Sequence, residues 1–431
     1  GGGMNELDNA EGRELSASMS ALMCLLQSIR TQPTTYPYLE EPLEQVLLKV
    51  FSGDARMEGF IDDGLEVINY LTYCAPRISE RMWGMFRPLC THWVRVGYDQ
   101  LDNINSVVDN YIRRGNQVFV SDPANLELVV NMVSNSIDNE QVPETYQARA
   151  LSLTSILLLN CREGHVTSYL PTIVSQQLAR ALHSKPGSEA LRIKVAVVAA
   201  HTLYNNAQAA VKAMHDDGSL ELIMAHTVAI AGGVASQFRN LWEHESDEEA
   251  VTWAKPTPVY NRVPNFQQRA FVLGLASVIA LPHAEAPPWL RDNMHRVISA
   301  AVKLAEHLAG RRGRRKKKEL WTEQEEATMR AHEGDWDDYG DDDDQTSVGS
   351  VSMDGDSEMS SGDSGWDYKA GGMKKGGKNK GLGFEDDSFD TGSEEELDED
   401  EREEMTAPIE GVDEVLYLRQ AIAHASSDTG W

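Results

Sequence analysis

The chain has 431 residues, of which 41% are hydrophobic and 7% aromatic, so it can bury a sizeable core. Its formal net charge is −29, from 39 Lys+Arg against 68 Asp+Glu. No apolar run approaches the roughly 18 residues that a membrane-spanning helix needs, and the first residues lack the charged-then-apolar pattern of a secretory signal. We therefore expect neither a membrane span nor a disulfide-stabilised secreted scaffold.

The four cysteines, Cys24, Cys74, Cys90 and Cys161, are far apart in the sequence and form no CxxC pair. Zinc sites and disulfide frameworks need closely spaced or regularly paired cysteines, so this pattern argues against both. We expect buried free thiols in a reducing compartment, with no metal and no cofactor.

Apolar residues recur with the helical period of 3.6 through residues 11–309, without the strict alternation typical of strands. The first two predicted helices bury the faces Leu15, Met19, Leu22, Leu26, Ile29 and Leu43, Val46, Leu47, Val50, with a break at Thr34–Pro37 between them. A third helix carries Met57, Ile61, Leu65, Ile68 and Leu71 and ends before Pro76. The body is therefore predicted to be all-α.

Turn residues group these helices into pairs that recur roughly every 40–47 residues, the period of HEAT and armadillo repeats. The predicted pairs are 11–51, 57–97, 101–139, 144–183, 188–238 and 264–309. Stacked pairs bury a continuous core and form a right-handed HEAT-repeat α-solenoid with a long concave surface. The alternative is a compact helical bundle, but a single bundle core stops growing well before about 300 residues, so length favours the solenoid.

Charge divides the chain into a nearly neutral body and a strongly acidic tail. Residues 319–431 hold 34 acidic and 8 basic residues, a net −26, whereas residues 1–318 carry only −3. The predicted organisation is a flexible N-terminus or cloning remnant (1–10), the solenoid (11–310), a basic block (311–318), a disordered acidic loop with a Gly/Lys interlude (319–408), and a C-terminal helix (409–431). We expect that last helix to dock onto the solenoid.

The basic block supports three interpretations. It consists of Arg311, Arg312, Arg314, Arg315, Lys316, Lys317 and Lys318. A nucleic-acid patch is disfavoured because the surrounding chain is acidic, so no direct nucleic-acid binding is expected. A nuclear localisation signal fits the composition, although such blocks are common. The remaining interpretation is an intrachain partner that holds the acidic loop near the body.

The acidic loop carries the predicted binding residues. Clustered carboxylates on a tether raise the local concentration of basic partners and screen their charge; the alternative is a solubilising tail with no specific partner. The candidate cargo-binding residues are Asp341, Asp342, Asp343, Asp344, Glu394, Glu395, Glu396, Asp398, Glu399, Asp400, Glu401, Glu403 and Glu404. Ser388 and Ser393 are flanked by acids and are candidate phosphorylation sites, where phosphate would deepen the negative charge.

No arrangement of residues predicts catalysis. The Lys-rich interlude lacks the spacing of a phosphate-binding loop, and no histidine pair has HExxH spacing. His201, His226 and His295 lie within helical patterns and are predicted to be satisfied, partly buried side chains. The chain is therefore predicted not to be an enzyme.

The order of features resembles the C-terminal part of importin-β-type transport receptors of the importin-seven/importin-eight branch. The residues that carry the resemblance are Ser79, Met82-Trp83, Pro88-Leu89, Gly97-Tyr98, the run Asp109-Asn110-Tyr111-Ile112, the segment Arg269–Leu275, the Trp-Asp-Asp acidic run, and the closing segment Val415–Trp431. The resemblance implies HEAT repeats and a C-terminal fragment of a longer receptor.

The same resemblance implies a function and partners. A nuclear import receptor of this kind carries basic proteins such as ribosomal proteins or histones, binds Phe-Gly nucleoporins, and shuttles between cytoplasm and nucleus. Ran-GTP would bind only through an N-terminal region that has no counterpart here. The alternative is a HEAT-repeat scaffold of a chromatin or ribosome-assembly complex whose acidic loop acts as a chaperone.

Overall fold

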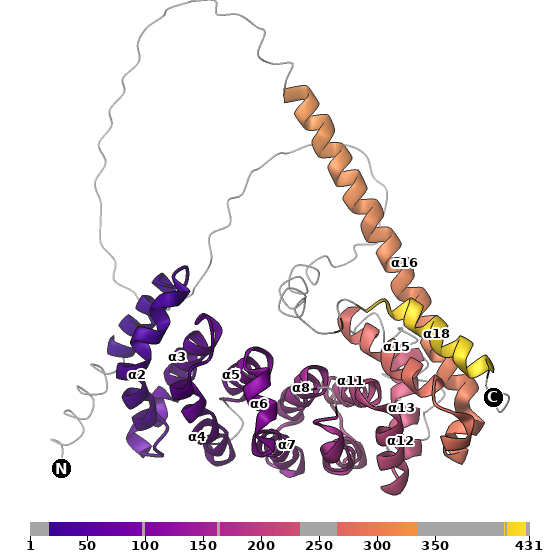
Figure 1. The fold of residues 1–431 in the computed structure, drawn as a ribbon, viewed down its shortest axis with the longest axis horizontal. Helices are drawn as coiled ribbons and strands as arrows, with labels where there is room; N and C mark the ends of the chain where they lie inside the picture. The colour runs from indigo at the N-terminus through magenta and orange to yellow at the C-terminus, as the bar shows by residue number, and fades with distance from the viewer. Residues whose placement is uncertain are drawn as a thin grey trace, which may run out of the picture. The chain divides into compact units, whose positions relative to one another are not determined.

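A computed structural model describes residues 17–96, 100–161, 164–232, 265–333, 409 and 412–427. All regular elements in these ranges are helices, which confirms the all-α prediction. The chain divides into two compact units, residues 1–313 with 396–431, and residues 314–395. Within the first unit the helices stack side by side in a row, as expected for a HEAT-repeat solenoid (Figure 1).

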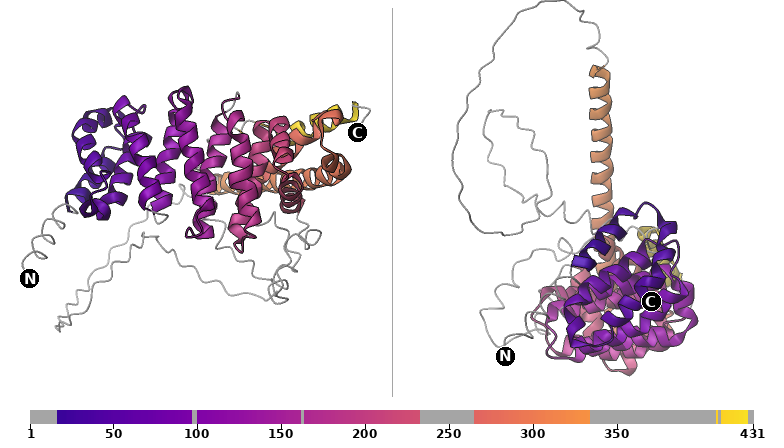
Figure 2. Two further views of the ribbon diagram at one scale, coloured as in Figure 1. Left: turned by 90° about the horizontal axis from the view of Figure 1, so that it is seen from below. Right: turned by 90° about the vertical axis from the view of Figure 1, so that its left-hand side faces the viewer.

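Two layers make up this row, and the first of them has six helices in which each contacts the next. They are α3 (Ile61–Tyr73), α5 (Leu101–Arg114), α8 (Glu144–Asn160), α11 (Glu189–Asn205), α15 (Asn265–Ile279) and α18 (Glu414–Ser427). The last place in the layer is thus filled by a helix from the end of the described chain, in yellow beside α15 in Figures 1 and 2.

The second layer is α2 (Tyr36–Val50), α4 (Glu80–Val96), α7 (Pro123–Asp138), the composite helix 167–183 and α12 (Ala207–Asp216). The composite helix joins α9 (Leu170–Thr172) and α10 (Arg180–His183) through a π-helical stretch, Ile173–Ala179. A helix over 17–28 precedes α2, α6 (Asn116–Ser121) precedes α7, and α13 (Leu220–Gly232) packs on α11 and α12. Short 3₁₀ turns span Pro33–Thr35, Ala55–Phe60, Thr167–Tyr169 and His283–Glu285.

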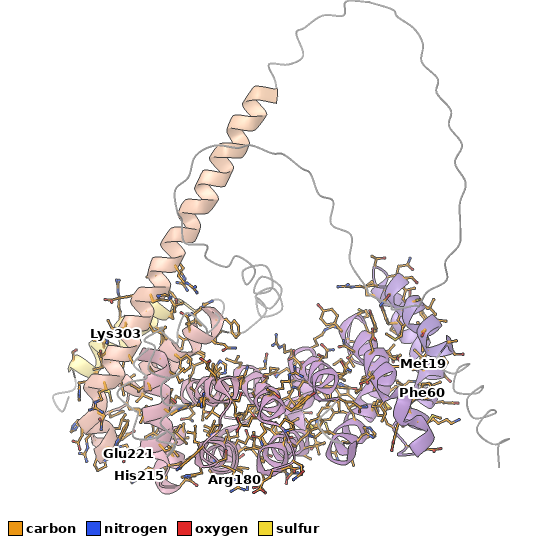
Figure 3. All side chains as sticks on the ribbon, turned by 180° about the vertical axis from the view of Figure 1, so that it is seen from behind. Met19, Phe60, Arg180, His215, Glu221 and Lys303 are labelled. Atoms are coloured by element: carbon orange, nitrogen blue, oxygen red, sulfur yellow. The ribbon has the colours of Figure 1, made fainter. Side chains whose placement is uncertain are left out.

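One contiguous hydrophobic core runs through both layers, from Met19 to Ala425. Figure 3 shows Met19 and Phe60 at the end of the row where the described chain begins, and Lys303 at the other end. Because each helix pair covers its neighbour's apolar face, the core grows along the row rather than around a centre. This arrangement agrees with the predicted solenoid and not with the compact bundle.

Polar side chains also link neighbouring repeats, and their sequence separations reveal the period. Asn110 donates to Asn69 at a separation of 41 residues, Asn116 donates to the Asn160 carbonyl at 44, and Asn205 donates to the Leu158 carbonyl at 47. These separations fall in the 40–47-residue range expected from turn spacing. Each bond therefore joins residues that lie about one repeat apart in the sequence.

Several local predictions need correction. The predicted break at Thr34–Pro37 is shorter, because Tyr36 begins α2 and Pro37 occupies its first turn, where proline is well tolerated. Met57 lies in the 3₁₀ turn before α3 rather than in that helix. Val46 is 38% exposed, so the buried face of α2 comprises Tyr36, Glu40, Leu43, Leu47 and Val50.

The last long helix differs most from its predicted bounds. α16 runs from Pro288 to Glu333, past the ends predicted at 310 for the solenoid and at 318 for the basic block. Arg, Lys, Glu, Leu and Ala dominate this stretch, and all are strong helix formers, so high charge alone does not end the helix. The predicted loop boundary at 319 therefore falls within α16.

Candidate partner-binding surfaces and the C-terminal docking site

The predicted cargo-binding acids lie outside the described residues. This holds for Asp341–Asp344, for the acids between Glu394 and Glu404, and for the candidate phosphorylation sites Ser388 and Ser393. Their role as a binding element remains a prediction from sequence.

One member of the basic block makes a described ion pair. Nη2 of Arg312, in α16, lies 2.5 Å from Oε1 of Glu414, the first residue of α18. One of the three interpretations of the block pairs it with the acidic loop; the contact that Arg312 makes is with the C-terminal helix. Residues 314–318 are helical in backbone, and their side chains lie outside the described set.

Glu414 is fully buried, and a second arginine reaches its other oxygen. Nε of Arg269, in α15, lies 3.4 Å from Oε2 of Glu414. Taking an ionised carboxylate out of water costs several kcal/mol, roughly, and two guanidinium groups are the partners that offset this cost. The two arginines therefore hold the start of α18 against the body.

Arg269 also binds the backbone just before α18. Its Nη2 donates to the carbonyl oxygens of Ile409 and Val412, each at 2.9 Å. Asp413 caps the helix by accepting from the N–H groups of Val415 and Leu416 at 3.0 Å. The Leu416 N–H in particular, then that of Val415 and the charge of Arg312, hold the pKa of Asp413 below its ordinary value.

The closing segment is amphipathic in sequence through Val412, Val415, Leu416, Arg419, Ile422 and Ala423, of which Val415 and Ile422 are partly buried against the core. In the structure the buried residues are Glu414, Leu418, Ala421 and Ala425, while Leu416 is 53% exposed. Alanines allow α18 to approach α15 closely, and the hydroxyl of Tyr417 lies 3.1 Å from that of Ser277. The helix thus docks onto the body as expected, and it does so through Glu414, Leu418, Ala421 and Ala425.

A second acidic surface, which sequence reasoning missed, lies on α3. Asp62, Asp63 and Glu66 are exposed or half-buried on one helix, and Asn103 of α5 donates to Asp62 at 2.9 Å. Partial burial first, then the charge of Asp62, raises the pKa of Asp63; partial burial and the charge of Asp63 do the same for Glu66. Such a group favours a cationic partner, because a positive charge relieves the repulsion. Its sequence signal is two adjacent acids with a third one turn later.

The histidines and cysteines singled out in the sequence differ in their burial. His226 is buried, and its Nε2 donates to the carbonyl of Arg192 at 2.8 Å. His201 is also buried, whereas His295 is exposed, which corrects its predicted partial burial. Cys90 and Cys161 are buried free thiols, and burial raises the pKa of each to about 12; Cys24 is exposed and Cys74 half-buried, so the prediction of buried thiols holds for two of four.

Within the described ranges, no group of three or more His, Cys, Asp or Glu side chains is arranged to hold a metal ion. Among the helices described, none has the length and apolarity to cross a bilayer.

Comparison with known proteins identifies relatives of one kind. The chain is 23% identical over 298 residues to an importin beta-like SAD2 homolog of Arabidopsis thaliana, which covers 69% of this chain and 27% of the relative. The chain is similar to importin-β-like proteins. Over 246 residues it is 22% identical to mouse importin-8, covering 56% of the chain and 23% of that protein.

A probable importin-7 homolog of Dictyostelium discoideum is 28% identical over 120 residues, which is 28% of this chain and 11% of the relative. The matched regions thus span between 11% and 27% of the length of these three importin-β-like relatives. No protein-family model and no solved structure matches the chain. The resemblance expected from the sequence, including the importin-seven/importin-eight branch, is confirmed by these relatives.

Proposed function

We propose that this chain is the cargo-binding part of a nuclear import receptor, without enzymatic activity of its own. The observation that carries the proposal is the similarity over 298 residues to an importin beta-like protein, on a chain that forms a two-layer helical array. A repeat array offers a long binding surface rather than a single closed pocket, which suits recognition of whole proteins. The receptor would shuttle between cytoplasm and nucleus.

The cargo would be basic, with ribosomal proteins and histones as the candidate classes. Two acidic features support this choice: residues 319–431 carry −26, and α3 presents Asp62, Asp63 and Glu66 with pKa values raised at the latter two. Neighbouring carboxylates repel one another, and a Lys- or Arg-rich partner stabilises them by supplying the opposite charge. Phe-Gly nucleoporins would bind elsewhere on the array, and Ran-GTP would need a region beyond this chain.

Deleting the acidic loop tests the cargo proposal directly. A lysine-rich protein such as a linker histone would be titrated against the intact chain and against a chain whose residues 335–404 are replaced by Gly/Ser repeats of equal length. Both would be measured at low and near-physiological salt, because exposed charge contacts weaken as the Debye length shrinks to about 8 Å. We expect the intact chain to bind in a salt-sensitive manner and the replacement to lose most of that affinity.

Equal affinities for the two chains would show that the loop does not bind cargo, and recognition would then have to be sought on the helices. The alternative scaffold or chaperone function predicts the same loop dependence, so a second measurement is needed. An import receptor binds immobilised Phe-Gly repeats, whereas a scaffold does not. A chain that binds basic protein but no Phe-Gly repeat would overturn the transport proposal and favour the chaperone.

A further inference from the structure

The contact between α18 and the body has the features of a ligand in a binding site. Elsewhere in the row, several of the described polar links between repeats join residues 41 to 47 positions apart. The links from Arg269 to Ile409 and Val412 span 140 and 143 positions instead. The helix that completes the first layer is therefore supplied from a remote part of the chain.

The site contacts this segment in three different ways. Arg269 and Arg312 both form ion pairs with the buried carboxylate of Glu414, the first residue of the helix. Arg269 also donates hydrogen bonds to the backbone before the helix, at the carbonyls of Ile409 and Val412. The helix α18 packs against α15, and its buried side chains after Glu414 are small or apolar. They are Leu418, Ala421 and Ala425, which follow the glutamate by 4, 7 and 11 residues.

The carboxylate, the backbone carbonyls and the small side chains together restrict which helices can bind more than hydrophobic packing alone would. A helix without the first-turn carboxylate would lose both ion pairs, and the pair with Arg269 is largely shielded from water, because that side chain is only 18% exposed. A helix with larger side chains in place of the alanines cannot approach α15 as closely. The site therefore selects an acidic amphipathic helix by charge, by backbone and by size.

We propose that Arg269, Arg312 and the side of α15 that α18 covers form a binding site for such a helix, that residues 409–427 are its intrachain ligand, and that this ligand is held by non-covalent contacts alone and can exchange. In the intact chain the covalent connection through 334–408 keeps helix and site at high effective concentration, which hides the intrinsic affinity. This inference does not depend on a transport function.

Cutting the connection exposes the intrinsic affinity while using the full chain. A specific protease sequence would be inserted between Gly376 and Gly377, the protein folded and purified intact, and the connection then cleaved. We expect the C-terminal fragment to co-elute with the body at micromolar concentration and to dissociate on dilution. A fragment that separates at micromolar concentration, or one that never separates on dilution, would overturn the proposal of an exchangeable ligand.

Charge recognition is tested with matched variants of the cleaved protein. Glu414→Gln keeps the shape of the side chain and removes its charge, so we expect at least a tenfold rise in the dissociation constant of the fragment. Arg269→Lys keeps a positive charge and loses the geometry that reaches two carbonyls, so an intermediate rise is expected. Leu416→Ala removes an apolar side chain that is 53% exposed, and this control should leave the constant unchanged.

A peptide competition avoids any dependence on the folding of the variants. A fluorescent peptide of residues 409–427 would be added to the cleaved wild-type protein, and its binding followed by anisotropy. The wild-type peptide should displace the fragment. The same peptide with Glu414→Gln should reach half displacement only at an at least tenfold higher concentration. Equal potency of the two peptides would show that the site does not recognise the carboxylate, and the proposal would fail.

Discussion

Gly274 of α15 lies directly against Ala200 of α11. A Cβ added at Gly274 would come within 2.4 Å of the Ala200 carbonyl oxygen and 2.9 Å of its Cα, and both of these are backbone atoms that cannot rotate away. This close approach brings α15, which carries the docking site of α18, onto the rest of the first layer.

Replacing Gly274 by alanine should therefore destabilise the C-terminal end of the row. The added methyl group forces the two helices apart, and overpacking of this kind costs roughly 1–3 kcal/mol in unfolding free energy. Gly84 of α4 is the matched control, because a Cβ there meets nothing within 4 Å. Gly84→Ala should be neutral or stabilise by up to about 1 kcal/mol through helix propensity, as measured by urea unfolding. Equal effects at both sites would contradict the packing described.

Gln177 should be required for the junction of three helices. Its side chain is fully buried in the π-helical stretch, accepts from Thr154 of α8 at 2.7 Å, and donates to the Val130 carbonyl and to Ser134 of α7 at 3.2 Å. Gln177→Leu leaves these partners buried and unsatisfied, which should cost roughly 2–4 kcal/mol in unfolding free energy because each such group costs about 1–3 kcal/mol.

The neighbouring Gln176 is exposed and provides the control for this substitution. Gln176→Leu should change stability by less than about 0.5 kcal/mol, as is usual for surface positions. Thermal unfolding followed by circular dichroism measures both variants. A Gln177→Leu protein as stable as the wild type would show that the three bonds contribute little to holding α7, α8 and the composite helix together.

His226 should make stability depend on pH between about 6.5 and 4. Burial first, and then the nearby Arg192 charge, lowers the pKa of His226 to about 4. Between the two pKa values the unfolded chain binds a proton that the folded chain does not, so unfolding free energy falls as pH decreases through this window and levels off below it. For this fully buried group the loss in unfolding free energy should be on the order of 3 kcal/mol.

The measurement for His226 is a difference between proteins, since many carboxylates titrate nearby in pH. Urea unfolding of the wild type and of His226→Gln would be compared at pH 7.0, 5.5 and 4.0. The stability gap between the two should narrow, or reverse sign, as the pH falls. His295 is exposed, so His295→Gln should track the wild type at every pH; a wild type and His226→Gln that run parallel would refute the assignment.

The α3 acids should contribute to binding of a basic partner. Replacing Asp62, Asp63 and Glu66 by Asn, Asn and Gln should weaken binding of a lysine-rich protein several-fold at low salt, with less effect at physiological salt. The variant should fold at least as well as the wild type, because the raised pKa values of Asp63 and Glu66 mark a site where negative charge is disfavoured.

A charge-matched control separates location from net charge. The set Glu127→Gln, Asp217→Asn and Glu221→Gln removes three exposed carboxylates from other parts of the row, so total charge changes equally. If both triple variants lose the same affinity in the titration, general electrostatic attraction accounts for the effect and α3 holds no special position.

Turn residues predicted the repeats well because they act locally. The pair predicted at 144–183 corresponds to α8, which begins at Glu144 after Pro143, and to the composite helix that ends at His183 before Pro186. Proline and glycine punctuate helices whatever surrounds them. The pair predicted at 188–238 contains α11, α12 and α13 instead of two helices, because Asn206 caps a new helix one residue after α11 ends.

The docking site was beyond local prediction. Glu414 has the sequence character of an ordinary acid in a first helical turn, and only two arginines more than 100 positions away make its burial possible. Helical periodicity of apolar residues also does not single out Ala421 and Ala425, which are buried, from Leu416, which is 53% exposed. Helical periodicity and turn spacing predicted the solenoid and the closing helix, but not the residues that join them.

The 140-residue separation between Arg269 and Ile409 also has a consequence for biosynthesis. Repeats near the start of the row can fold as they leave the ribosome, because their partners lie within one repeat of them. The outer side of α15 must instead wait until the whole acidic segment and residues 414–427 have been translated. During that interval its apolar side is open to chaperones and to the corresponding helix of a neighbouring nascent chain, so the timing of translation decides which helix it meets first.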